Sequence, residues 1–431
     1  IESINQLISR SNAQPLFAVL VLNLVGFKYV NESMGLPAGD EILNVVAERI
    51  RAVVRPGDHP ARIGGDEFVL LLDHPLPEEQ FNLRLNHFFD LLLQPHTMSM
   101  SNGGSVVSLK ASAGVAFFPK DGTTAHQLLR SAELALMSAR HAGNQSYQFF
   151  DPQLLVAAEH RRRIEDDLKN AIGEGELYLG FQPIVDLASG KVVGAESLMR
   201  WAHPTRGMVP PDVFIPLAEE IGVIGEIGLL VLENACQVVS RWRAAGHQLY
   251  ASVNVSALQI PNLLPPSVVL DALRRNGLPN DAIAIEITEG VLMGNVSAAL
   301  DWMRELGDQG LRIYLDDFGT GYSSLSYLKR FPLNAVKIDK SFIRDLAEDS
   351  NDKALVNAIV TMAKSLTLDV IAEGVETEVH FKMLREMGCH LGQGFFFSPA
   401  VKAEAFASTV IDIEQRLAQI EVTGGPHVQK N

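Results

Sequence analysis

The chain has 431 residues, 47% hydrophobic and 20% charged, which excludes a wholly disordered protein and predicts two or three domains. Its formal net charge of −15 argues against a nucleic-acid polymer as partner, because such a protein needs a basic face. Residues 1–150 hold 14 acidic and 11 basic residues and the rest hold 37 and 25, so most of the negative charge lies in the second part. Solvated surface or a cation site would explain that excess.

The cellular location is predicted from two features of the sequence. The two cysteines, Cys236 and Cys389, cannot form a disulfide framework, and no apolar run is long enough for a membrane helix. We therefore expect a cytoplasmic location. The chain begins at Ile1 instead of Met, so any attachment to the inner membrane is expected to lie in upstream sequence.

The first 150 residues alternate strand-like and helix-like segments and predict an α/β domain. Phe17–Leu24 is an apolar strand candidate, and Ala38–Val54 has helical spacing. Arg62–Leu72 reads as two strands around Gly64 and Gly65, which is typical of a tight hairpin. A further strand region and a further helix are predicted at Val106–Phe118 and Thr124–His141.

A charged helical stretch at Pro152–Ile172 predicts a linker helix that belongs to neither core. We place the domains at residues 1–150 and 174–410, the linker at 151–173, and the end of a helix with a disordered tail at 411–431. The second domain shows a regular alternation of strands and helices, with the count and size of a TIM-like (β/α)8 barrel. Its strand candidates are Leu177–Val185, Val192–Met199, Leu249–Val255, Ala282–Ile287, Arg312–Leu315, Ala335–Ile338, Asp369–Ala372 and Cys389–Phe396.

Polar residues stand at the ends of these strands, where a barrel brings distant parts of the chain to one face. Taken singly, each carboxylate is best explained as a helix cap or a solvated loop residue, but one at nearly every strand points to a shared site. Acids with an amide and a lysine suit Mg²⁺ or Mn²⁺ rather than Zn²⁺, and metal-activated water attacking a phosphodiester is the chemistry best served. The residues are Gln182, Glu196, Asn254, Glu286, Asp316, Asp317, Lys337, Asp339, Glu373 and Gln393.

At about residues 160–405 the chain resembles the EAL phosphodiesterase family. Glu196-Ser197-Leu198 stands at the name motif, with Ser in place of the usual Ala. Ser197 is expected to point away from the metal if Glu196 faces it. The other matching motifs, in family order, are Val253-Asn254-Val255-Ser256, Glu286-Ile287-Thr288-Glu289, Asp316-Asp317-Phe318-Gly319-Thr320-Gly321, Lys337-Ile338-Asp339 and Ala372-Glu373-Gly374-Val375-Glu376.

The EAL resemblance implies hydrolysis of cyclic di-GMP to linear pGpG with two Mg²⁺ or Mn²⁺ ions, and a homodimer. It implies that Asp316 bridges two metal sites and that Lys337 steadies the attacking water. Glu289 is implied to anchor the loop after Asp317. The implied metal ligands are Glu196, Asn254, Glu286, Asp316, Asp317 and Glu373, with Glu196, Asp316, Asp317, Lys337 and Glu373 as the catalytic set. The implied substrate contacts are Gln182, Arg200, Asp339, Glu376 and Gln393.

Residues 13–150 resemble the GGDEF diguanylate cyclase family, which implies a cyclase-like domain with a mainly antiparallel central sheet. The name motif is Gly64-Gly65-Asp66-Glu67-Phe68. Arg55 and Asp58 match the family's inhibitory site for cyclic di-GMP, with the spacing Arg-Xaa-Xaa-Asp. The implied nucleotide site comprises Lys28, Asn31, Asp40, Gly64, Gly65, Asp66 and Glu67.

At several positions the residue differs from the one usual in the cyclase family. Asn23 replaces the Asp that ligates metal in the family, which should weaken a magnesium site considerably. Gly143-Asn144-Gln145 lacks the usual arginine, and Leu36 replaces the usual His. We therefore expect a regulatory domain that binds GTP or cyclic di-GMP rather than an efficient cyclase.

Three alternatives remain open beside a phosphodiesterase regulated by GTP. The chain could be a catalytically silent receptor for cyclic di-GMP, although the intact acidic set argues against that. It could be bifunctional, which Asn23 and Asn144 count against. Finally, a magnesium-dependent barrel could act on another phosphate ester, which substrate competition would expose.

Overall fold

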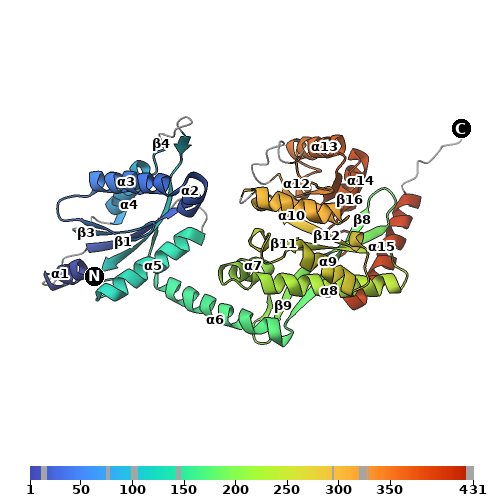
Figure 1. Ribbon diagram of the computed structural model, residues 1–431, viewed down its shortest axis with the longest axis horizontal. Helices are drawn as coiled ribbons and strands as arrows, with labels where there is room; N and C mark the ends of the chain where they lie inside the picture. The colour runs from blue at the N-terminus through green and yellow to red at the C-terminus, as the bar shows by residue number, and fades with distance from the viewer. Residues whose placement is uncertain are drawn as a thin grey trace. The chain divides into compact units, whose positions relative to one another are not determined.

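The computed structural model describes residues 1–10, 17–73, 78–98, 105–141, 147–293, 296–319, 328 and 330–423. The chain divides into two compact units, Ile1–Arg163 and Ile164–Asn431 (Figure 1). The expected disordered tail falls largely on residues 424–431, outside the described residues. Within the described ranges, no helix combines the length and apolar character needed to cross a bilayer.

The first unit is built on a five-stranded sheet in the order β2-β3-β1-β6-β7. All of its pairings are antiparallel except that of β6 with β7, which confirms the expected mainly antiparallel sheet. A separate hairpin joins β4 and β5. The strands are β1 (Phe17–Val25), β2 (His59–Gly64), β3 (Glu67–Asp73), β4 (His96–Met98), β5 (Ser105–Val107), β6 (Lys110–Phe118) and β7 (Tyr147–Phe149).

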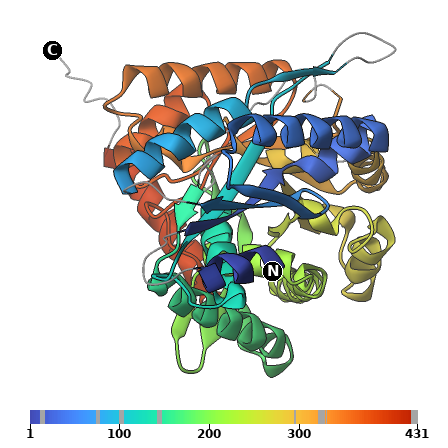
Figure 2. The same ribbon diagram turned by 90° about the vertical axis from the view of Figure 1, so that its left-hand side faces the viewer.

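Two hydrophobic cores flank this sheet, because β1 is buried on both faces. Helices α3 and α4 pack on one face, and α1 and α5 on the other (Figures 1 and 2). Gly114 of β6 lets α5 approach closely, since a Cβ there would lie 1.9 Å from the Ala132 carbonyl oxygen. The helices are α1 (Glu2–Arg10), α2 (Phe27–Met34), α3 (Leu36–Val53), α4 (Glu78–Leu92) and α5 (Ala125–His141).

The second unit contains a closed eight-stranded barrel, as expected. Its strands follow the order β9-β11-β12-β13-β14-β15-β16-β8, and β8 closes the ring by pairing with β9. Unlike an all-parallel barrel, β8 runs antiparallel to both neighbours, because a short turn joins it directly to β9. The strands are β8 (Leu177–Asp186), β9 (Val192–His203), β11 (Tyr250–Val255), β12 (Ile283–Thr288), β13 (Arg312–Phe318), β14 (Ala335–Ile338), β15 (Asp369–Ala372) and β16 (Leu391–Gly392), with β10 (Gly207–Val209) and β17 (Val401–Lys402) added at the edges.

Helices surround the barrel, and the main core lies between them and the strands (Figure 1). A smaller apolar cluster, which includes Tyr250, Tyr314 and Ile371, lies inside the barrel. The helices are α7 (Pro211–Glu220), α8 (Ile224–Ala244), α9 (Pro266–Arg275), α10 (Val296–Asp308), α12 (Lys340–Arg344), α13 (Ser350–Ser365), α14 (Glu378–Met387) and α15 (Ala403–Thr423), with 3-10 turns η1 (Ala257–Gln259), η2 (Asn280–Ala282) and η3 (Glu289–Met293).

Two elements differ from expectation. Helix α6 (Pro152–Glu174) was expected to belong to neither core, but Ile164, Leu168 and Ala171 are buried in the core of the second unit. The strand expected at Cys389–Phe396 is only two residues long. It ends because the chain turns at Gly394, where a Cβ would lie 2.2 Å from the Val375 backbone, and the following phenylalanines pack as a loop.

Candidate active site in the barrel

The barrel strands and the segments that follow them bring together eight of the expected residues, although Gln182 and Glu196 lie within their strands and not at the ends. Gln182 is directly opposite Glu196 in the β8–β9 pairing, and Asn254 is paired with Glu286 across β11 and β12. The alternation of side chains along each strand turns these residues inward. Asp316, Lys337, Glu373 and Gln393 follow from β13, β14 and the segments after β15 and β16.

Lys337 lies at the centre of the acidic cluster and is fully buried. Its Nζ is 2.6 Å from Glu373 Oε1 and 2.7 Å from Glu286 Oε2. It is also 3.3 Å from Asp316 Oδ1 and 3.4 Å from Glu196 Oε2. One ammonium group thus contacts four carboxylates, which leaves an excess of negative charge.

Two amide side chains donate hydrogen bonds to Glu196, and a third, Gln182, accepts from one of them. Asn254 Nδ2 donates to Glu196 Oε1 at 2.7 Å, and Gln393 Nε2 donates to Glu196 Oε2 at 2.7 Å. Gln393 Nε2 also donates to Gln182 Oε1 at 2.8 Å, and Gln182 Nε2 donates to the Ser398 carbonyl oxygen at 3.3 Å. Glu196 is therefore held in one orientation by neighbours from three other strands or loops.

The pKa values of the acids show that the cluster lacks positive charge. Burial and the nearby Glu196 raise the pKa of Glu286 well above its ordinary value, despite Lys337. Burial likewise raises the pKa of Glu373 to about 7, with Lys337 opposing it. Burial also disfavours the charge of Glu196, but Lys337 and the two amide donors outweigh it and lower its pKa.

The same acids fit divalent cations. Glu196, Glu286 and Asp316 each offer an oxygen within 4.8 Å of the others, and so do Asp316, Asp317 and Glu373. Asp316 belongs to both groups. Glu286 Oε1 is buried without a hydrogen-bond partner among the described residues, so it is free to coordinate an ion. Hard oxygen ligands of this kind suit Mg²⁺ or Mn²⁺.

The other expected residues lie around this cluster. Asp317 has a left-handed backbone (φ 56°), and burial raises the pKa of its carboxyl group. Glu289 Oε1 accepts from the Gly319 backbone at 3.3 Å, at the start of the loop that it was expected to anchor; residues 320–327 of that loop lie outside the described residues. Asp339 caps α12 by accepting from the Ser341 backbone at 2.9 Å. Glu376 is exposed.

A cavity of about 530 Å³ adjoins the cluster. It lies between β9, β11, η1, α7 and the first half of α8, and both Arg200 and Asn254 line it. Ser197 lines it as well, whereas its neighbour Glu196 contacts Lys337, so Ser197 points away from the acids as expected. The wall is mainly apolar, which suits a flat organic group beside the acidic cluster.

The GGDEF motif of the first unit forms the turn between β2 and β3. Gly65 has a positive φ of 51°, and its carbonyl oxygen accepts from Arg62 Nε at 2.9 Å. Glu67 is paired with the buried Asn23 of β1, which places the motif beside the eroded metal position. Gly64 and Glu67 are exposed and Asp66 is half-buried.

The other expected nucleotide residues lie on α2 and α3. Lys28 and Asn31 belong to α2 and Asp40 to α3. Asn31 packs on Gly39, where a Cβ would lie 1.9 Å from Asn31 Oδ1, so a larger residue there would displace the Asn31 side chain. Asn144 lies outside the described residues.

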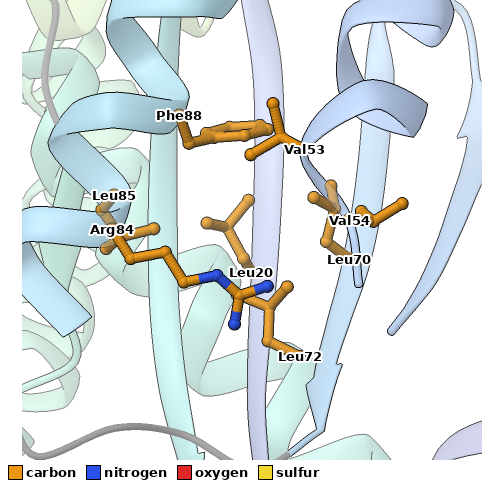
Figure 3. Close-up of a pocket in the computed structure, with 8 residues that line it drawn as sticks. All are labelled: Leu20, Val53, Val54, Leu70, Leu72, Arg84, Leu85 and Phe88. Atoms are coloured by element: carbon orange, nitrogen blue, oxygen red, sulfur yellow. The ribbon is translucent and has the colours of Figure 1, made fainter. Parts of the chain in front are cut away.

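The expected inhibitory pair includes one buried residue. The carboxylate of Asp58 is 2% exposed and accepts from the backbones of Arg55 and Asp73. It also pairs with Arg84 of α4, a residue that no sequence motif singled out. Figure 3 shows the Arg84 guanidinium group among apolar side chains, beside a cavity of about 10 Å³, room for about one water. Arg84 Nη1 has no partner among the described residues.

Comparison with known proteins identifies both units. The EAL domain family matches residues 165–400, and the diguanylate cyclase GGDEF domain family matches residues 1–146. The chain therefore belongs to the EAL domain family, and a GGDEF domain precedes the EAL domain.

Two curated relatives come from Pseudomonas aeruginosa. The chain is 40% identical over 395 residues to the bifunctional diguanylate cyclase/cyclic di-GMP phosphodiesterase MucR, covering 91% of the chain and 57% of MucR. It is 40% identical over 382 residues to the cyclic di-GMP phosphodiesterase NbdA, covering 88% and 48%. The chain thus spans about half the length of these relatives.

Solved structures agree with the barrel. The MucR phosphodiesterase in complex with cyclic di-GMP is 41% identical, with a TM-score of 0.55, and the match covers 57% of this chain and 99% of that one. The cAMP-bound EAL enzyme Bd1971 is 25% identical with a TM-score of 0.57, covering 73% and 92%.

Proposed function

We propose that this protein hydrolyses cyclic di-GMP to linear pGpG at the end of the barrel. The observation that carries the proposal is the cluster of four carboxylates around the buried Lys337, with two overlapping groups of metal ligands. It is supported by a relative named as a cyclic di-GMP phosphodiesterase and by the cyclic di-GMP complex of the MucR domain.

Two divalent ions, Mg²⁺ or Mn²⁺, are the expected cofactors. Glu196, Asn254, Glu286 and Asp316 would hold one ion, and Asp316, Asp317 and Glu373 the other. When bound, such ions supply a water of lowered pKa and neutralise charge on the phosphate. Lys337 stays protonated, since the four acids raise its pKa despite burial, and so can donate a hydrogen bond to an oxygen that gains charge.

The substrate is expected to lie over this cluster and in the adjoining cavity. Arg200 lines that cavity and would meet a phosphate or base edge, while Gln182 and Gln393 face the acids. Asp339 and Glu376 would contact the nucleotide from the segments after β14 and β15. Glu289 would keep the loop after Asp317 in place, as its contact with Gly319 suggests.

The GGDEF domain is proposed to regulate the barrel. GTP would bind beside Lys28, Asn31 and Asp40 and the turn Gly64–Glu67, while Asn23 limits cyclase activity. Cyclic di-GMP would bind near Arg55 and Asp58. We place the domains at residues 1–150 and 174–410, joined by α6, whose second half packs on the core of the EAL domain after the division at Arg163. A homodimer and a cytoplasmic location complete the proposal; the latter is supported by two free, buried cysteines.

The test is turnover of cyclic di-GMP by the purified chain with Mg²⁺ or Mn²⁺, followed by chromatography for pGpG. Glu196→Ala is the control, because it removes a ligand and the acceptor of three side chains. Product that forms in the wild type and not in the variant supports the proposal. Tight binding without product would make the barrel a receptor instead.

A further inference from the structure

Helix α15 reaches the active-site loop from outside the family match, which ends at residue 400. Arg416 of α15 donates two hydrogen bonds through Nη2, to the carbonyl oxygen of Phe396 at 2.6 Å and to that of Phe397 at 2.8 Å. Its guanidinium carbon also lies 5.4 Å from the centre of the Phe396 ring. One planar cation therefore holds two consecutive peptide groups and an aromatic ring.

Arg416 binds the segment from Gln393 to Ser398, and both ends of this segment make contacts in the active site. Gln393, at its start, donates to Glu196 and Gln182, and the carbonyl oxygen of Ser398, at its end, accepts from Gln182. The two carbonyl groups bound by Arg416 lie between these points. A displacement of residues 394–398 would therefore move both glutamines.

The same segment supports the loop that carries Glu373. The Phe396 backbone donates to the Val375 carbonyl oxygen at 2.8 Å, and the Val375 backbone donates to the Gln393 carbonyl oxygen at 3.0 Å. Gly394 allows this contact, because any Cβ there would meet the Val375 backbone. Thus the loops after β15 and β16 form one backbone-bonded unit, which Arg416 holds from outside.

We infer that Arg416 is a positioning residue for substrate binding, acting through the segment 394–398 on Gln182 and Gln393. This inference rests on the proposed function, since those glutamines are its expected substrate contacts. It assigns α15 a role in the site beyond closing the barrel core. Glu196 keeps Asn254 and Lys337 as partners, and Lys337 also contacts Glu286 and Glu373 directly, so the metal ligands should move less than the two glutamines.

Glu414, two residues earlier on α15, provides a matched control. Its Oε2 is 2.9 Å from Lys191 Nζ, and its Oε1 accepts from the Val192 backbone at 3.2 Å. These contacts tie the same helix to the turn between β8 and β9, at the end of the barrel remote from the acids. Glu414→Gln thus loosens α15 without touching the site.

The experiment measures kcat and KM for cyclic di-GMP, the Mg²⁺ concentration for half-maximal rate, and Tm, for the full chain and three variants. We expect Arg416→Ala to raise KM about ten-fold with little change in kcat or Mg²⁺ dependence. Arg416→Lys should be intermediate, because it keeps the charge but loses the planar fork, and it also serves if the alanine variant does not fold. Glu414→Gln should lower Tm by about as much as Arg416→Ala does, but it should leave KM unchanged.

Equal KM values in the Arg416 variants and the wild type would overturn the inference, as would a lower kcat alone, which indicates only a loss of folded enzyme. If the wild type binds without turnover, the Kd for cyclic di-GMP with Ca²⁺ replaces KM: a higher Kd in the Arg416 variants supports the inference, and an unchanged Kd overturns it. A wild type that neither turns over nor binds cyclic di-GMP overturns the proposed function, and this inference with it.

Discussion

Lys337 and the four carboxylates around it are the residues on which the account depends most. The Lys337 Nζ lies 2.6 to 3.4 Å from a carboxylate oxygen of each of the four acids. This arrangement would be stable if the charges balanced, but one ammonium group faces four acids. Burial raises the pKa values of Glu286 and Glu373, and repulsion among the acids, which reflects that imbalance, raises them further. Divalent ions would relieve it, so metal binding and stability should be coupled.

Glu286→Gln tests this coupling at one residue. It keeps the side-chain shape and removes a buried charge, so we expect the metal-free protein to be unchanged or stabilised by about 1 kcal/mol. Mn²⁺ should raise the Tm of the wild type and have much less effect on the variant. Thermal unfolding with EDTA and with Mn²⁺ measures both effects, and an equal metal-induced rise in Tm would contradict the assigned ligand set.

Arg84 and Asp58 give a second prediction at the residue scale. Arg84→Met should destabilise the first unit by about 3 kcal/mol, because it leaves the buried carboxylate without its cation. Urea unfolding followed by a probe in the first unit measures the change. The double variant Asp58→Asn with Arg84→Met should recover part of the loss, and an additive loss would show that the pair is not coupled.

Residues that act at strand ends could be found from the sequence, whereas residues that act through loops could not. Glu286 and Asp316 stand near the ends of apolar strands and Glu196 stands within one, so periodicity and motif spacing locate them. Arg84 and Arg416 are ordinary surface-type residues on amphipathic helices. Their partners are 26 and about 20 positions away in the chain, and no local pattern encodes such contacts.

At the scale of elements, α6 shows that a helix with many charged residues can still pack on a hydrophobic core. Only one narrow stripe, with Ile164, Leu168 and Ala171, is buried, so the many exposed charges dominate the composition. The sequence made no prediction for the direction of β8, since a strand's sequence does not report whether its neighbour is parallel. The short β16 was overestimated because Phe395–Phe397 has strand-like composition but packs as a loop.

The second half of α6 is tied to the end of β9 by Asp167, whose carboxylate is 3.0 Å from His203 Nε2 and 3.2 Å from Arg206 Nη2. The hydrogen bond with His203 contributes most to lowering the pKa of Asp167, so the contact stabilises the fold at neutral pH and is lost at acid pH. Asp167→Asn should cost less than about 1 kcal/mol at pH 7, because the carboxylate is partly exposed.

The pH dependence of this variant tests whether the stabilisation depends on the charge of Asp167. The difference in free energy of unfolding between wild type and Asp167→Asn should shrink as the pH falls below about 4, because the carboxylate of the unfolded chain then takes up a proton before that of the folded protein, whose pKa is lowered. Urea unfolding at pH 7 and pH 3 measures it. A difference that grows at pH 3 would mean that the contact does not depend on the charge of Asp167.

At the scale of the whole molecule, the chain joins a GGDEF domain with altered residues to an EAL domain whose expected acids are all present. The order of the motifs was enough to predict this tandem organisation, because each motif set is long and family-specific. The relation between the two domains cannot be read from motifs in the same way. It depends on how strongly each state of one domain favours a state of the other.

GTP provides the test of that relation. We expect GTP to change the rate of cyclic di-GMP hydrolysis by the full chain several-fold at subsaturating substrate, a coupling of typical size. The variant with Asn31→Ala and Asp40→Ala should lose the response and keep the basal rate. A rate that GTP leaves unchanged at every substrate concentration would rule out this regulation.

The most direct test of the central claim is the product of cyclic di-GMP turnover in ¹⁸O-labelled water with Mg²⁺. Hydrolysis breaks one bond between phosphorus and a 3′ oxygen, and the water oxygen joins the phosphorus while a proton goes to the 3′ oxygen. The account predicts pGpG whose 5′ phosphate carries one ¹⁸O, formed by the wild type and absent with Glu196→Ala. No pGpG from the wild type, or the same amount from the variant, would contradict it.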